Sequence, residues 1–461
     1  MLFALVLGVY LLSPNVTNTD AYLAVPTAVS IVHSGDLDLD EFSSPIVRRH
    51  YGFIEVRGRH FDHFPWADAL LFVPGVLVVD GLSRIGIGHS AAELVEDNMM
   101  GALQLATASL VTALAALVVA VVAYQRLKTQ ERTRRRAAFA VGAVFAFGTA
   151  AWSTASRALW QHGPSMLALG LALLFALRLE RQGQDHPERR AWVPALALGA
   201  ILATAYALRP TNAVAVVAFT ALVALRHRDV LLWHLSGLTV VLGTFLAVNL
   251  ASYGQVLPMY FGPGRISLHP AFLEAITANL VSPARGLLVF SPVVVLAAAG
   301  VVIGVKRRSV APLDVVAAVC VAVHVGVVSA QNEGWWAGHA FGPRFLTDVL
   351  PFLAFLSLPA VQALLDSTRA GDRTPAFRSA AAAVALAIAT SVIVNGQGAL
   401  LKSSTCWNVE PQNIDHDPSR VWALRHPQVL AGFEAFATGS ARSAVFGPCR
   451  GPTAAADLAR G

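Results

Sequence analysis

Residues 101–123 are the clearest apolar stretch of the chain, 23 residues in which the only polar side chains are one Gln, one Ser and two Thr. A helix rises about 1.5 Å per residue, and about 20 residues suffice to cross the hydrocarbon core of a bilayer. Inside that core only helices and closed barrels satisfy every backbone polar group. The stretch therefore predicts a membrane-spanning helix.

The composition indicates that such segments recur. Hydrophobic residues make up 55% of the 461 residues and charged residues only 13%, whereas a soluble chain is about 25% charged. This balance excludes a disordered protein, a nucleic-acid binder with a basic face and an ordinary cytosolic enzyme. We expect an all-α polytopic membrane protein with about 11 transmembrane helices. The other predicted spans are residues 2–13, 137–155, 163–177, 192–208, 213–225, 230–250, 286–305, 311–330, 346–364 and 379–396.

The basic residues predict an orientation for these spans. Five alternate connections hold 18 of the 34 Lys and Arg residues, and such residues are enriched in cytoplasmic loops. We therefore place these connections and the N-terminus in the cytoplasm. The dominance of Arg over Lys is typical of a bacterial chain, so we expect a multi-pass protein of a bacterial plasma membrane. The five connections are 125–136, 178–190, 226–228, 306–308 and 369–378.

One short segment decides the topology of the N-terminal third. Residues 69–79 are apolar but number only 11, which is about 17 Å of helix and too short for a core of about 30 Å. We interpret the segment as an interfacial, half-inserted helix. Residues 14–98 then form one large external loop that carries juxtamembrane helices. A crossing would instead place Asp20 in the cytoplasm.

The C-terminal tail, residues 397–461, follows the last predicted span. We expect it to be a small extracytoplasmic segment, separate from a transmembrane domain over residues 1–396. The tail holds Cys406 and Cys449, while Cys320 lies within a span. An oxidising exterior favours a disulfide between the first two cysteines, and a pair of unrelated free thiols is the alternative.

The polar residues that suggest chemistry lie in the predicted external connections, and Asp20 is the first of them. It comes shortly after the first predicted helix, at the membrane surface. A carboxylate there can act as general base toward a hydroxyl that arrives from water. Asp is also favoured at helix N-caps, so a capping role for Asp20 is the alternative.

Residues 57–66 form a second polar cluster, which includes Arg59, Asp62 and His63. Its aromatic side chains suit an anchor at the lipid interface. Its Arg and His side chains suit a subsite for phosphate and sugar. The spacing of His60 and His63 also suits a metal ion, but no second pair of ligands is evident.

Four further external segments carry Arg, His or Trp side chains. An Arg buried at a helix end costs about 2.5–3.5 kcal/mol, so Arg209, Arg285 and Arg344 need an anionic partner. A lipid-linked phosphate would supply one, because its oxygens match the guanidinium fork. Snorkelling of each Arg to lipid headgroups is the alternative. The segments are 160–164 with His162, 209–212, 282–286, and 334–344 with Trp335, Trp336 and His339.

This pattern resembles the GT-C superfamily of polyprenyl-phosphate-sugar-dependent glycosyltransferases, in particular bacterial proteins similar to protein O-mannosyltransferases and the lipid A aminoarabinose transferase. The resemblance covers most of residues 1–396 and rests first on Asp20 and on the short Pro-containing helix of the first external loop. The family often has Asp-Glu where this chain has Asp20-Ala21, so one carboxylate is missing. The other motifs are AVPTA at 24–28, GDLDL at 35–39, WQHGP at 160–164, RPTN at 209–212 and GPR at 342–344.

The resemblance implies an inverting transfer of a hexose or pentose from a polyprenyl-phosphate donor to an acceptor hydroxyl of a glycan, lipid or protein, on the extracytoplasmic face. Asp20 would be the catalytic base. Because the donor is already activated, we expect no cofactor. The residues implied for the donor phosphate are Arg209, Arg285, Arg344, His162 and Arg59. Those implied for the sugar and acceptor are Asp62, His63, Trp335, Trp336 and His339.

A secondary transporter, or a flippase for lipid-linked sugars, is the alternative because it also needs many spans. Transporters usually place ionisable groups near the bilayer midplane and show repeated halves. Here the main ionisable residues near or within the spans are His234, His324 and Asp314, and no internal repeat is evident. The weight of polar residues in the external connections therefore favours the transferase.

Overall fold

The computed structural model describes residues 1–17, 20–185, 191–257, 260, 262, 264–332, 334–439, 444, 445, 447 and 449. This part of the chain is largely helical. Six of its helices are long and apolar enough to cross a membrane, as a multi-pass membrane protein requires. They are α6 (Gly101–Arg126), α8 (His162–Asp185), α11 (Leu231–Tyr253), α15 (Pro312–Ser329), α16 (Leu350–Arg369) and α17 (Pro375–Leu400).

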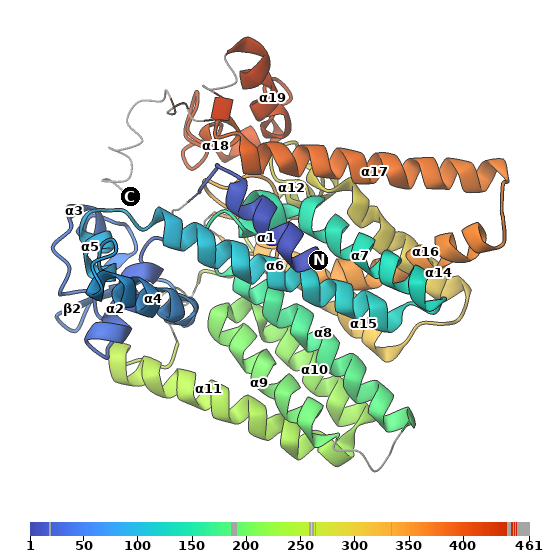
Figure 1. Cartoon of the computed structure of the whole chain (residues 1–461), viewed down its shortest axis with the longest axis horizontal. Helices are drawn as coiled ribbons and strands as arrows, with labels where there is room; N and C mark the ends of the chain where they lie inside the picture. The colour runs from blue at the N-terminus through green and yellow to red at the C-terminus, as the bar shows by residue number, and fades with distance from the viewer. Residues whose placement is uncertain are drawn as a thin grey trace.

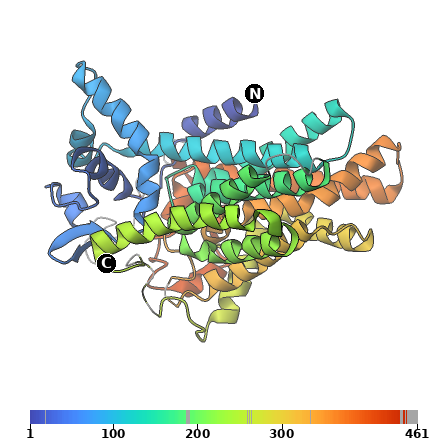
Figure 2. The ribbon, with the colours of Figure 1, turned by 90° about the horizontal axis from the view of Figure 1, so that it is seen from below.

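The helices run side by side as one bundle (Figure 1 and Figure 2). Glycines bring α9 (Trp192–Leu208) and α11 to backbone distance. A Cβ atom on Gly199 would lie 2.0 Å from the carbonyl oxygen of His234, and one on Gly237 would lie 2.1 Å from that of Leu196. Small residues at such contacts allow membrane helices to pack closely, so any larger side chain at either glycine would separate the pair.

Several predicted spans are shorter or interrupted in the structure. The predicted span 286–305 is broken by Pro292, which has no backbone N–H to continue a helix. The predicted span 137–155 continues beyond its helix as a single π-helical turn. The count of 11 spans therefore stays a prediction. The shorter elements are α1 (Leu2–Leu12), α7 (Glu131–Phe147), η2 (Ala151–Ala155), α10 (Ala213–Arg226), α13 (Leu287–Phe290), η6 (Pro292–Val294) and α14 (Val295–Lys306).

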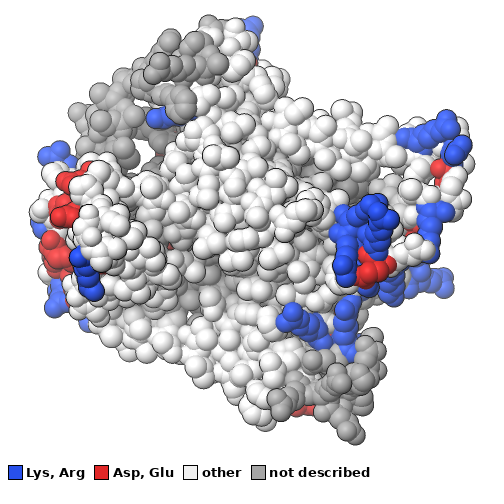
Figure 3. Space-filling view, in the orientation of Figure 1, with Lys and Arg blue, Asp and Glu red and all other residues white. Residues whose placement is uncertain are grey.

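The basic connections gather at one end of the bundle. Figure 3 shows Lys and Arg side chains concentrated on the right, where α7 begins and α16 ends. Arg189 and Arg190 of the second connection lie outside the described residues. The helices of the predicted external loop lie at the opposite end of the bundle (Figure 1). This separation of the two ends agrees with the charge pattern of the sequence.

The predicted external loop contains short helices and one β-hairpin. Its segment 69–79 is divided between η1 and α4, and α4 has only 12 residues, too few to cross a bilayer. The hairpin corrects the expectation of a purely α-helical chain. Its turn residues Arg57 and Gly58 have φ of 55° and 79°, as a tight hairpin turn requires. The elements are α2 (Ala24–His33), α3 (Pro45–Arg48), β1 (Phe53–Val56), β2 (Arg59–Asp62), η1 (Trp66–Leu71), α4 (Val73–Arg84) and α5 (Ala91–Glu96).

The C-terminal tail forms a small packed unit. The predicted boundary at residue 397 falls inside α17, which runs to Leu400. The unit buries Trp335 and Trp407 against α12 (Phe272–Val281), and a disulfide joins Cys406 to Cys449. Residues 451–461 lie outside the described residues. The elements of the tail are α18 (Ser403–Cys406), η8 (Pro418–Trp422) and α19 (Gln428–Thr438).

Candidate active site

Asp20 lies in the turn that precedes α2, and its carboxylate has partners from two distant segments. Nη1 of Arg344 donates to Oδ2 at 3.0 Å, and the hydroxyl of Tyr51 donates to Oδ1. The N-cap of α2 is Leu23, and that helix has no side-chain cap. The structure therefore argues against the capping role that the sequence left open for Asp20.

Arg344 begins the turn η7 (Arg344–Leu346) and is 6% exposed. Its guanidinium lies over the ring of Trp160 at 4.3 Å and that of Phe345 at 5.1 Å. Gly342 makes this placement possible, because its φ is +68° and a Cβ there would lie 2.6 Å from the ring of Phe290. Two stacked rings and the ion pair with Asp20 thus fix the position of the Arg344 guanidinium.

A second ionic cluster is centred on Asp348, which lies between η7 and α16 and is fully buried. Its Oδ2 lies 3.1 Å from Nε of Arg209, 3.2 Å from Nδ1 of His162 and 3.5 Å from Nε2 of His324. The guanidinium of Arg209 supplies the positive charge that offsets the burial of this carboxylate. Asp348 is therefore a fixed negative charge that positions Arg209 and His162.

The two clusters meet in one cavity with an empty volume of about 300 Å³, open solvent at its mouth included. Its walls come from segments that lie far apart in the sequence. At the same end of the bundle α8 begins, α9 ends, and η7 leads into α16. The lining is both charged and aromatic. Its residues are Asp20, Ala21, Phe64, Asp68, Trp160, Gln161, His162, Arg209, Tyr260, Arg344 and Phe345.

Several polar atoms of this lining are buried and have no hydrogen-bond partner among the described residues. They are Nε1 of Trp160, Nε2 of Gln161, Nε of Arg344 and Oδ1 of Asp68. Native proteins leave few buried polar atoms unpaired, so a group of four around one cavity requires an explanation. A polar, anionic ligand would satisfy the three donors.

Asp62 and His63 lie beside this cavity. Asp62 ends β2 and is buried, and its carboxylate accepts a hydrogen bond from the backbone N–H of Phe64 at 3.0 Å. Burial, with the charges of Asp68 and Asp20, raises the pKa of Asp62 well above its usual range. The ring of His63 packs edge-on to that of Tyr260 at 5.5 Å, and burial lowers the pKa of His63.

Arg285 differs from the role that the resemblance implies for it. It is fully buried beneath the tail, and all its N–H groups are directed to oxygens of the chain. Nη2, for example, donates to the carbonyl of Gly338 at 2.8 Å and to Oδ1 of Asn408 at 2.9 Å. Burial lowers the pKa of Arg285 to about 9, which leaves it protonated at neutral pH. Its hydrogen bonds attach the tail to the bundle and leave none for a phosphate.

The predicted sugar residues of segment 334–344 also contact the tail. Trp335 is buried in the tail core, and Nε1 of Trp336 donates to Asp415 at 2.7 Å. Nε2 of His339 lies 2.8 Å from Asn413 and 3.2 Å from Asp415. The structure thus separates these three side chains from the lining of the Asp20 cavity.

Arg59 is likewise outside the cavity. It stands at the tip of the hairpin with its side chain 63% exposed, and its Nη1 pairs with Asp38 at 2.6 Å. Asp62 lies at the other end of the hairpin. The placement differs from the phosphate contact that the resemblance implies.

Sequence reasoning missed Asp68, Asp348, Tyr51 and His324 as site residues. Asp348 had a detectable signal, since it follows the GPR motif by four residues at the start of a span. Tyr51 and Asp68 have no detectable signal in the sequence, because only the folded loop brings them to Asp20. His324 is among the ionisable residues that the sequence places near or within the spans, and its ring lies beside Asp348.

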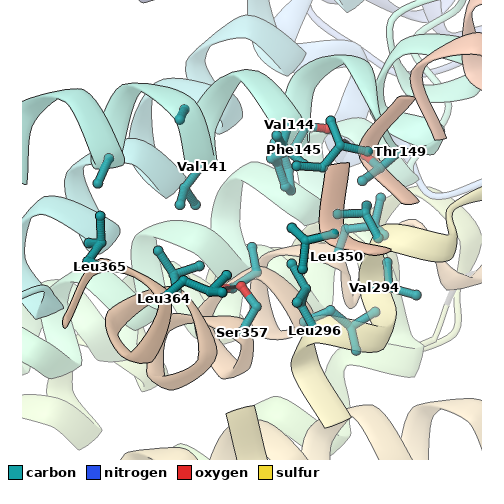
Figure 4. Close-up of a pocket in the computed structure, with 18 of the residues that line it drawn as sticks. Val141, Val144, Phe145, Thr149, Val294, Leu296, Leu350, Ser357, Leu364 and Leu365 are labelled. Atoms are coloured by element: carbon teal, nitrogen blue, oxygen red, sulfur yellow. Dashed lines mark hydrogen bonds between the residues drawn. The ribbon is translucent and has the colours of Figure 1, made fainter. Parts of the chain in front are cut away.

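A second cavity lies among α7, α14, α16 and α17 (Figure 4), and its empty volume, open solvent included, is about 1000 Å³. Its lining is aliphatic and aromatic, with no charged side chain among the lining residues. The only polar groups are the hydroxyls of Thr149, Ser357 and Thr368. Such a cavity suits a hydrocarbon chain and has no group that could act on a sugar.

No family model matches the chain, and no curated protein sequence matches it. Two solved structures of ArnT from Cupriavidus metallidurans are similar in fold. The apo state has a TM-score of 0.49 and 14% identity, over 93% of this chain and 72% of that chain. The state bound to undecaprenyl phosphate has a TM-score of 0.47 and 16% identity, over 88% of this chain and 67% of that chain.

Proposed function

We propose that the protein is an inverting membrane glycosyltransferase that moves a sugar from a polyprenyl-phosphate donor to an acceptor hydroxyl on the extracytoplasmic face. One observation carries this proposal. Asp20 and two buried arginines, Arg209 and Arg344, line one cavity, and three N–H donors of its lining lack partners among the described residues. The cavity thus combines a carboxylate with a site for an anion, and these are the two requirements of the reaction.

Asp20 acts as the general base in this proposal. Its carboxylate takes the proton of the acceptor hydroxyl while the oxygen of that hydroxyl attacks the anomeric carbon of the sugar. Arg344 and Tyr51 hold the carboxylate in place from either side. General-base assistance contributes typically about 10² to 10⁴-fold to a rate. The sugar is already activated by its phosphate, so the step requires neither a nucleotide nor a redox cofactor.

Arg209 and Arg344 act on the leaving group. As the bond between the anomeric carbon and the phosphate oxygen breaks, its electron pair stays on the phosphate and adds negative charge there. Fixed guanidinium and N–H donors stabilise such developing charge without reorganisation. Nε of Arg344 and Nε1 of Trp160 are available for it. A single displacement of this kind inverts the configuration at the anomeric carbon.

The extracytoplasmic location rests on the separation of the two ends of the bundle. The basic connections lie opposite to the external loop that holds Asp20 (Figure 1 and Figure 3). We propose that all 11 predicted segments cross or enter the membrane, and that the protein is in a bacterial plasma membrane. Reporters fused before residue 69, for example after Asp40, and after Asp97 should both report the exterior, and one at Arg134 the cytoplasm. A cytoplasmic reading at the first position would contradict this topology, because residues 69–79 would then cross the membrane.

The proposed reaction is tested with purified protein in nanodiscs, a labelled polyprenyl-phosphate sugar and an envelope extract as acceptor. We expect label in the acceptor fraction, with the anomeric configuration opposite to that of the donor when the product is analysed by NMR. Retained configuration would contradict the single displacement. Movement of intact labelled lipid across the bilayer without transfer would instead support the flippase alternative.

A further inference from the structure

Asp68 is a second carboxylic acid in the Asp20 cavity, in a different environment. It lies in the first turn of η1, is 3% exposed and lines the cavity. Its Oδ1 has no hydrogen-bond partner, and it forms no ion pair among the described residues. Asp20, in contrast, pairs with Arg344 and accepts from Tyr51. Two carboxyl groups in one site but in opposite environments commonly take opposite proton states.

The surroundings of Asp68 contain no cation that pairs with it. Burial raises the pKa of Asp68 to about 7, because desolvation disfavours the charged form. The neighbouring Asp62 adds a second acid of raised pKa rather than a positive charge. Of the elements packed on η1, α2 carries His33, α4 carries Asp80 and Arg84, and α9 carries Tyr206. The groups that share the cavity or lie near it are Asp20, Asp62, His63, His162, Arg209, Tyr253, Tyr260, Arg344 and Arg265, which stacks on the ring of Tyr260 at 3.7 Å.

Four of the basic groups are paired with other carboxylates, and His63, whose buried Nδ1 has no partner among the described residues, has a pKa that burial lowers. Arg209 and His162 are bound to Asp348, Arg344 to Asp20, and His33 to Asp80 at 2.7 Å. No ion pair therefore stabilises the ionised form of Asp68. A protonated Oδ1 would add an acidic donor to a lining that also holds the N–H donors of Trp160 and Gln161, which have no partner among the described residues.

We propose that Asp68 is protonated in the resting site and donates a hydrogen bond from its carboxyl group to an oxygen of the sugar-phosphate donor. This inference rests on the proposed function and adds a residue that recognises the donor. The proton stays on Asp68 throughout, so Asp20 remains the only base. When Asp68 loses its proton, the cavity loses a donor and gains a negative charge that repels the phosphate.

The pH dependence of transfer tests this role. Activity of the natural protein should fall as the pH rises through about 7, because the folded site then loses the proton of Asp68. Asp68→Asn keeps an N–H donor of similar shape and cannot ionise, so it should remain active and lose the alkaline decline. Asp68→Ala should lose about 10- to 100-fold below about pH 7, because it removes a hydrogen bond to a charged group, and should show no alkaline decline. Asp80→Asn, a buried carboxyl of the same loop outside the cavity, is the control and should keep the decline.

A readout that does not depend on turnover separates this inference from the proposed function. Infrared spectra of the protein in nanodiscs should show a carbonyl band of a protonated carboxylic acid that disappears near pH 7 and is missing from Asp68→Asn. That band without any sugar transfer would contradict the proposed function alone. Absence of the band in the natural protein would overturn the inference. So would an inactive Asp68→Asn, which would mean that an ionised carboxylate is required, or unchanged activity and pH profile in both Asp68 variants.

Discussion

Two buried arginines illustrate how similar sequence signals differ in the folded protein. Arg344 and Arg285 both follow a proline-containing turn in a predicted external segment, and both are stacked near aromatic rings. Arg285 donates to five oxygens of the protein itself, three of them backbone carbonyls. Arg344 pairs with one carboxylate and keeps a buried Nε without a partner. The first is a structural link, and the second has capacity left for a ligand.

The comparison teaches that burial alone does not mark a functional arginine. A buried guanidinium is costly unless its donors are satisfied, and the tail satisfies those of Arg285 completely. Around Arg344, Trp160 and Gln161 line the same cavity, and each has a buried donor without a partner among the described residues. Unused hydrogen-bonding capacity, shared by several side chains, is what distinguishes the two regions.

The largest loss of turnover is expected when an arginine side chain of the cavity is truncated. Arg344→Ala and Arg209→Ala should each lower turnover by about 10² to 10³-fold, because each removes a fixed positive charge from the leaving phosphate. Donor affinity should fall as well, since the charge acts in both the ground state and the transition state. Transfer kinetics and binding of the labelled donor measure the two effects. Arg59→Ala, on the exposed hairpin, is the matched control and should change neither.

At Arg285 the expected effect falls on stability rather than on turnover. Arg285→Met should lower the free energy of unfolding by about 3 kcal/mol or more, because buried carbonyl and amide oxygens lose their donors. Thermal unfolding in detergent measures the loss. Donor affinity of the folded fraction should stay within about twofold of that of the natural protein. A specific loss of donor affinity would show that Arg285 binds the phosphate after all.

Removal of the disulfide should have the smallest effect on transfer. The bond between Cys406 and Cys449 closes a 43-residue separation, for which the chain-entropy model gives about 4 kcal/mol of stabilisation. The double variant Cys406→Ser and Cys449→Ser should therefore unfold at lower temperature with near-normal turnover. Thiol alkylation of non-reduced, denatured protein checks the bond itself, and free reaction of both cysteines would disprove it.

The sequence predicted the helices well because lipid imposes a simple requirement. A long apolar run such as residues 101–123 must form a helix, and α6 does so over Gly101–Arg126. The exact number of membrane crossings could not be predicted from hydropathy alone. Pro292 breaks one predicted span, and α10 has fewer residues than a crossing usually needs. The hairpin was missed because four-residue strands leave little periodicity to detect.

The site was predicted in part for a similar reason. Asp20, His162, Arg209 and Arg344 each border a span, so their common end of the bundle followed from topology. Arg285 and the Trp335–Trp336 pair border the same end, but the tail covers them, and no local pattern predicts which segment a tail will contact. Asp68 could not be found either, because its importance depends on burial without a cation.

The most direct test of the central claim is the activity of Asp20→Asn. Asn keeps the shape of Asp20, and its single amide oxygen can accept from Tyr51 or from Arg344, which donate to different oxygens of Asp20, but it cannot take a proton from the acceptor. We therefore expect a loss of turnover of about 10² to 10⁴-fold, with expression and donor binding largely intact. The measurement is sugar transfer in nanodiscs beside binding of the labelled donor. Retention of more than about a tenth of the natural turnover would contradict the claim, because the loss of a general base should lower turnover by at least about 10²-fold.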